Sequence, residues 1–273
     1  MTLILEYLAQ TTVPVEVEGL IPSAVGGKSL AEIHERPTVH GNRKLPLAEL
    51  FRVSGDPADE RIELRGDLAG VHWIGAGMDR GEIRVLGHAG RHVGSEMTGG
   101  RITVEGDAGD WLGGQMHGGL IRVRGRVGHL VGAAYRGSPK GMTGGTILVE
   151  GPAGNEIGHG MRRGLIAVGG ADDAVGFGMI AGSILVFGPC GIRPGAGMRR
   201  GTIAILGPER PGLLPTFRYG CRYRPLFLAM LLRELVRLGY PVPQSLLTAE
   251  IDLYHGDFVA LGRGEVLFAS HNP

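Results

Sequence analysis

Methionine recurs at a regular interval through the middle of this 273-residue chain. Seven of the nine methionines are separated by 19, 19, 26, 19, 18 and 19 residues; they are Met78, Met97, Met116, Met142, Met161, Met179 and Met198. A glycine follows each of them three positions later. A fixed period of about 20 residues is typical of a solenoid, because one short unit buries its apolar face only by stacking on the next.

Each repeat also carries an alternating apolar segment bounded by glycines. In one repeat Ile102 and Val104 form this segment, and Leu112 and Met116 follow as further apolar points. Alternation predicts a strand with one buried face, and glycine permits the sharp corners between segments. The sequence therefore predicts an all-β solenoid, a right-handed parallel β-helix with coils of about 19 residues. The methionines would form a core ladder rather than bind metal, and irregular offsets of the buried points exclude a left-handed hexapeptide helix.

Three segments are expected along the chain. Residues 1–55 form a small N-terminal α+β segment, and residues 56–207 form the β-helix, with about eight glycine-rich coils. Residues 208–273 form a C-terminal extension with a helical tail. The two flanking segments are needed because the unpaired strand edges of a solenoid invite aggregation unless they are capped.

Local patterns give the flanking segments some structure. The N-terminal segment is expected to contain strands at 3–8 and 13–17, and a short helix that begins at Ser29 with a capping box. The C-terminal extension is expected to contain an amphipathic helix at 224–239, ended by a glycine, and a last strand at 257–268.

Composition excludes several classes of partner. The formal net charge is +1, so nucleic acid and anionic membrane surfaces are not expected partners. The chain contains no run of about 18 apolar residues and no secretory signal at its N-terminus. Cys190 and Cys221 have neither metal-ligand spacing nor the pattern of a disulfide framework. We therefore expect a cytoplasmic protein that carries no iron–sulfur cluster of its own.

The sequence offers one candidate for a catalytic or metal-binding site. Successive repeats place polar residues at the same corner: His72, Arg91, Asp110, His129, Asn155 and Asp173. Stacking would set Asp110 beside His129, as in a metal site or a proton relay, but no third partner stands at a definite spacing. Motifs of hydrolases, zinc proteases and nucleotide-binding loops are lacking. We expect no catalytic, cofactor-binding or metal-binding residue in this chain.

Two features indicate possible contact surfaces. Seven additional residues interrupt the period between Met116 and Met142, and insertions in solenoids often form recognition loops. Tyr135, Arg136 and Lys140 would be its contact residues, unless the loop is only a tolerated insertion. The outward strand positions become apolar in the last coils, including Leu185, Phe187 and Leu206. This stripe would be covered either by the C-terminal helix or by another subunit.

The repeated Gly-x-x-Met-x-x-Gly-x-Ile-x-Val-x-Gly resembles a known solenoid. It is similar to the GXGXG β-helix shared by the glutamate synthase large subunit and by the C subunit of formylmethanofuran dehydrogenase. The entry segment 41–55, the loop 135–145 and the exit segment 214–219 resemble the dehydrogenase family. The tail from Cys221 onwards is more similar to the bacterial form, the C subunit of the formyltransferase/hydrolase complex.

The resemblance implies a non-catalytic structural subunit in one-carbon metabolism. The complex would move a formyl group from formyl-tetrahydromethanopterin to a methanofuran-type carrier and release formate. Its formyltransferase subunit, amidohydrolase-like subunit and a further subunit would be the partners, with the carrier, tetrahydromethanopterin and zinc held by those subunits. Alternatives are the C subunit of a tungsten or molybdenum formylmethanofuran dehydrogenase, and a glutamate synthase-like domain. An autonomous polysaccharide-active β-helix is disfavoured, since only 5% of residues are aromatic.

Overall fold

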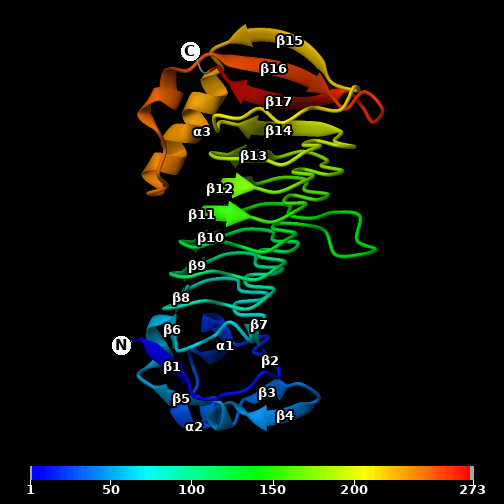
Figure 1. Cartoon of the computed structure of the whole chain (residues 1–273). Helices are drawn as coiled ribbons and strands as arrows, with labels where there is room; N and C mark the ends of the chain where they lie inside the picture. The colour runs from blue at the N-terminus through cyan, green and yellow to red at the C-terminus, as the bar shows by residue number, and fades with distance from the viewer. Residues whose placement is uncertain (1, 271–273) are drawn as a thin grey trace.

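The structure is a computed structural model that describes residues 2–270. The chain is predominantly β, with a 13-stranded sheet and a small four-stranded sheet. Figure 1 shows the strands of the long sheet stacked one above another along the molecule, with the N-terminal segment at one end and the C-terminal segment at the other. Within residues 2–270, no helix combines the length and the apolar character needed to cross a membrane.

The middle of the long sheet is a parallel ladder in which each strand pairs with the next repeat. Its strands are β6 (Arg61–Arg65), β8 (Glu82–Val85), β9 (Arg101–Val104), β10 (Leu120–Val123), β11 (Thr146–Ala153), β12 (Leu165–Ala171), β13 (Ser183–Val186) and β14 (Arg200–Ile205). Equivalent positions pair across the ladder, as Ile83 does with Ile102 and Ile102 with Ile121. These isoleucines are fully buried, because in-register strands turn the same alternate residues to the same face.

The methionines mark a second line of contact between neighbouring repeats. The backbone N–H of Thr98 donates to the carbonyl of Met78 at 2.8 Å, and that of His117 donates to Met97 at 2.8 Å. All seven methionines are 0% exposed. The glycine three positions later has a steric reason: a Cβ on Gly100, whose φ is +81°, would lie 2.7 Å from the Met78 Cε. The Gly-x-x-Met-x-x-Gly spacing therefore reflects contact between one repeat and the next.

The N-terminal segment covers one end of the stack. β1 (Leu3–Tyr7) pairs in parallel with β6 and antiparallel with β5 (Phe51–Ser54). The small sheet consists of β2 (Val15–Glu16), β3 (Pro37–His40), β4 (Arg43–Pro46) and β7 (Val71–His72). The short helices are α1 (Pro22–Val25) and α2 (Leu30–His34), with 3-10 turns η1 (Leu47–Glu49) and η2 (Pro57–Asp59). Ser29 caps α2 in the expected capping box with Glu32.

The C-terminal segment closes the other end in the same manner. β17 (Arg263–Ala269) pairs in parallel with β14, and β16 (Ile251–Gly256) and β15 (Arg218–Tyr223) follow antiparallel. The last strand thus begins later than the expected 257–268. Helix α3 (Leu226–Arg237) lies beside the stack in Figure 1, followed by the 3-10 turn η3 (Gln244–Thr248).

Helix α3 covers the apolar stripe on the outside of the last strands. Leu185 and Leu206 are 1% and 3% exposed and belong to a second apolar cluster that includes Leu232 of the helix. Phe187 packs beside this cluster, with its ring 5.2 Å from that of Tyr240. The expectation that Leu185 and Leu206 offer a surface to another subunit is therefore wrong, since the chain's own helix buries them. Phe187 is only partly exposed and belongs to the same packing.

Candidate functional site

The polar corner residues form a ladder of side chain to backbone hydrogen bonds. Asp110 Oδ1 accepts from the backbone N–H of His129 at 2.7 Å, and His129 Nδ1 accepts from that of Asn155 at 2.9 Å. Asn155 and Asp173 accept from the next repeats in the same way, and His72 accepts from Arg91. The juxtaposition of Asp110 and His129 is real, but their roles are to tie one repeat to the next. Within residues 2–270, no group of three or more His, Cys, Asp or Glu is placed to hold a metal ion.

In three successive repeats the following position carries an aromatic ring, and these rings form a cluster that was not predicted from the sequence. The rings of Trp73 and His92 stack with centroids 4.0 Å apart and an interplanar angle of 3°, and Trp111 continues the stack 6.1 Å from His92. Their φ angles are +63°, +64° and +62°. Such values are rare outside glycine, but Leu130 shares this conformation in the next repeat, so it belongs to the corner geometry.

Tyr135 of the inserted loop packs onto this aromatic cluster. Its ring lies 4.8 Å from that of Trp111, and its hydroxyl oxygen lies 3.2 Å from His92 Nδ1. The pKa of His92 is lowered to about 4, mainly by burial and further by the nearby Arg91 and His72, while Asp110 opposes the shift. Burial also raises the pKa of Tyr135. The cluster is therefore neutral near pH 7, and it holds the start of the loop against the stack.

The inserted loop forms one wall of a cavity of about 230 Å³, the mixed cavity, which is lined by both polar and apolar residues. Its lining includes Tyr135, Arg136, Glu156 and His159. His159 Nδ1 lies 2.7 Å from a carboxylate oxygen of Glu156. Arg136 is exposed, whereas Tyr135 is half-buried and anchors the loop. The structure thus separates two residues that the sequence analysis treated alike.

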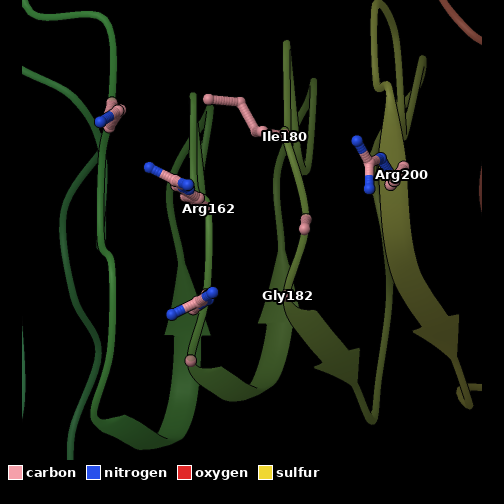
Figure 2. A pocket seen from close by; sticks show the side chains of 8 residues that line it. Arg162, Ile180, Gly182 and Arg200 are labelled. Atoms are coloured by element: carbon pink, nitrogen blue, oxygen red, sulfur yellow. The ribbon is translucent and has the colours of Figure 1, made fainter.

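A second cavity, of about 470 Å³, adjoins the loop through Lys140 and is strongly basic. Lys140, Arg162, Arg163 and Arg200 line it together with Gly164, Ile180, Ala181 and Gly182. Figure 2 shows Arg162 and Arg200 on either side of the segment that carries Ile180 and Gly182. Of these residues, only Lys140 was predicted as a contact residue from the sequence. A sequence signal for the arginines was present, since an arginine pair follows Met161 and another follows Met198.

Together these features are suited to binding rather than to covalent chemistry. The aromatic cluster offers a rigid face, the mixed cavity offers an imidazole next to a carboxylate, and the basic cavity offers positive charge. Cys190 lies partly buried, and burial raises the pKa of its thiol to about 12, which keeps it protonated and unreactive near pH 7.

A solved structure matches nearly the whole chain. It is a chain of the formyltransferase/hydrolase complex from Methylorubrum extorquens, crystallised with methylofuran. The sequence identity is 33% and the TM-score is 0.92, over 98% of this chain and 100% of the other. No known family profile matches the sequence.

Curated relatives match over shorter stretches. The C subunit of the tungsten-containing formylmethanofuran dehydrogenase 2 from Methanothermobacter thermautotrophicus is 40% identical over 95 residues, which are 33% of this chain and 35% of that protein. The C subunit of the molybdenum-containing enzyme 1 from the same organism is 41% identical over 79 residues, or 29% of this chain and 20% of that protein. This chain thus aligns with about a third or less of the length of these curated relatives. The local matches are named C subunits of formylmethanofuran dehydrogenases, and a solved chain is 33% identical over its full length. This chain therefore belongs to the family of formylmethanofuran dehydrogenase C subunits.

Proposed function

We propose that this chain is the non-catalytic structural subunit of a formyltransferase/hydrolase complex. The complex would convert formyl-tetrahydromethanopterin to formate through a formylmethanofuran-type intermediate in one-carbon metabolism. The observation that carries the proposal is the full-length match to a chain of such a complex, at 33% identity and a TM-score of 0.92. A match over 98% of this chain includes both flanking segments as well as the repeats.

We propose that chemistry and cofactors reside in the other subunits. These would be a formyltransferase subunit, an amidohydrolase-like subunit with zinc and a further subunit, with tetrahydromethanopterin and a methanofuran-type carrier as their ligands. The related complex was crystallised with methylofuran, which is a carrier of the expected type. This chain would supply a rigid surface on which those subunits assemble.

We infer a right-handed parallel β-helix with coils of about 19 residues as the form of this scaffold. Its support is the ladder of backbone hydrogen bonds after each methionine, which runs beside the parallel sheet. Residues 56–207 would be the coiled body, and residues 1–55 and 208–273 would act as its two caps. Strands β1 and β17 fit this division, because each continues the sheet at one end.

The inserted loop is our candidate for an interface with other subunits, with Arg136 and Lys140 as exposed contacts and Tyr135 as the anchor.

To test the function, the tagged chain is isolated from its native source under mild conditions. Formyltransferase and formate-releasing activities should co-purify with it, and a chain that elutes alone would contradict the proposal. Arg136→Ala should weaken assembly by about 2 kcal/mol if the side chain is a hot spot, whereas Arg101→Ala should not.

The C subunit of a tungsten or molybdenum formylmethanofuran dehydrogenase is the second candidate. The names of the curated relatives at 40% and 41% identity favour it. The same purified complex distinguishes the two functions. A redox enzyme would reduce an artificial electron acceptor with the formylated carrier, whereas the hydrolytic complex would release formate without any acceptor.

A further inference from the structure

The arginines of the basic cavity beside the inserted loop have no part in the scaffold described so far. Two kinds of residue shape it. The turn that follows Met179 carries Ile180, Ala181 and Gly182, so its last two residues leave little side chain in the centre of the hollow. The turns of the neighbouring repeats carry arginines, and these stand around that low point (Figure 2).

The backbone holds these turns in fixed positions. The N–H of Arg162 donates to the Met142 carbonyl at 2.8 Å, and the N–H of Arg199 donates to that of Met179 at 2.8 Å. Each arginine therefore leaves the stack from a hydrogen-bonded turn that packs on the buried methionine ladder. A rigid base of this kind lowers the entropy lost when the side chains engage a ligand.

The four cations of the cavity lack counter-charges. Within residues 2–270, the charged side chains of the four residues form no ion pair and no hydrogen bond, and no acidic residue lines the cavity; they belong to Lys140, Arg162, Arg163 and Arg200. Arg80 occupies the position of Arg163 in an earlier repeat and pairs with both Glu60 and Asp79. The chain thus neutralises a turn arginine elsewhere but leaves this group of like charges unbalanced, which is unfavourable unless an anion occupies the site.

We propose that this cavity binds a carboxylate-rich segment of a partner subunit. Arginine pairs with carboxylates through two parallel hydrogen bonds, so several Asp or Glu side chains on one peptide segment would engage these guanidinium groups. One small anion would leave most of the four charges unpaired. The cavity also adjoins the inserted loop through Lys140. The choice of a protein partner rests on the proposed function, in which this chain assembles with other subunits.

The first test uses the isolated full chain and a fluorescently labelled hexaaspartate peptide as the probe. The cavity variant is Arg162→Gln/Arg163→Gln/Arg200→Gln, and the matched control is Arg43→Gln/Arg101→Gln/Arg233→Gln. All six arginines are exposed, and both variants change the net charge equally. Fluorescence anisotropy should show about tenfold weaker binding, or more, for the cavity variant only, since each exposed ion pair contributes modestly. Equal loss in both variants, or none in either, would overturn the proposal.

A competition arm separates a peptide segment from a small anion. Inorganic phosphate is titrated against the bound peptide at constant ionic strength, with chloride as the reference. Phosphate that displaces the peptide no better than chloride supports a multi-carboxylate segment. Phosphate that displaces it at micromolar concentration assigns the cavity to a small anion and refutes the segment.

The final arm uses the assembled complex. Partner subunits should dissociate from the cavity variant at lower salt than from the control variant, as judged by size-exclusion chromatography. Identical salt stability of the two complexes would refute the proposal even if the peptide binds. A chain that never assembles, in either form, would count against the proposed function instead, while the peptide measurement would still report on the cavity.

Discussion

Met116 shows what the repeat demands of a single side chain. It is 0% exposed in the ladder between Met97 and Met142. Met116→Asp should destabilise the protein by about 4 kcal/mol or more, because a carboxylate buried without a partner must lose its hydration or take up a proton. Thermal unfolding measures the change. Met230→Asp is the control: Met230 is 68% exposed on α3, so this variant should melt nearly as the wild type does. Equal melting temperatures of the two variants would contradict the inward position of Met116.

His92 gives a prediction for pH dependence. Its pKa is lowered to about 4 in the folded chain, while an unfolded histidine titrates near 6.5. Between these values unfolding takes up a proton, so the contribution to stability is complete above about pH 6.5 and is lost as the pH falls towards 4. Allowing for partial exposure, we expect a loss of about 1 to 2 kcal/mol.

Chemical denaturation at pH 7 and pH 5 measures this effect. The control is His92→Asn, because asparagine tolerates the positive φ at this position. The variant should be less stable at pH 7 but should lose less stability on acidification. His72, whose pKa is also lowered mainly by burial, acts in the same direction and remains in both proteins. An unchanged pH dependence would exclude His92 as its source.

At the scale of elements, α3 is held by one apolar face. Leu232 is 0% exposed within the second cluster, whereas Leu226 of the same helix is 81% exposed. Leu232→Ala should cost about 3 kcal/mol and weaken the cover over Leu185, while Leu226→Ala should cost less than about 0.5 kcal/mol. Binding of a dye that reports exposed apolar surface should rise for Leu232→Ala only. No rise would mean that the stripe stays covered without the Leu232 side chain.

The inserted loop has a spectroscopic reporter. The only two tryptophans of the sequence, Trp73 and Trp111, both lie in the aromatic cluster that Tyr135 joins. Tyr135→Ala should shift their emission to longer wavelength and speed tryptic cleavage after Arg136 by about tenfold, since each aromatic pair contributes about 1 kcal/mol. Tyr135→Phe keeps the ring and should behave nearly as the wild type. Unchanged cleavage in the alanine variant would show that something else holds the loop.

Periodicity made the repeats predictable but not the clusters on their surface. The spacing of Met97 and Gly100 records a contact between repeats, so the sequence alone indicates stacking. Trp73, His92 and Trp111 were also in phase, 19 residues apart, and that signal was available. Tyr135 is out of phase and joins them only through the path of the loop, which no period encodes. The sequence indicated β1, β2 and β17 in the caps. Their antiparallel partners were missed for the same reason, because each occurs once: β3, β4, β5, β15 and β16.

At the scale of the whole molecule, the proposed role predicts an inert isolated chain. The purified chain should show no formyl transfer and no formate release, because the cavities described here bring together charges and rings rather than an activated nucleophile. Assays with formyl-tetrahydromethanopterin and a methanofuran-type acceptor check this. Adding back the partner subunits is the positive control, and turnover by the rigorously purified chain alone would refute the scaffold role.

The two ends of the molecule are joined by a stack of near-identical steps, which makes the chain a molecular ruler. Removing residues 82–100 would delete one whole step between β6 and β9 and join a glycine corner to the next strand. The ends would then approach by about 4.8 Å, the spacing of neighbouring strands. Neither cap would lose its own pairing, because β1 binds β6 and β17 binds β14. The number of repeats therefore fixes the distance between whatever is bound at one end and whatever is bound at the other.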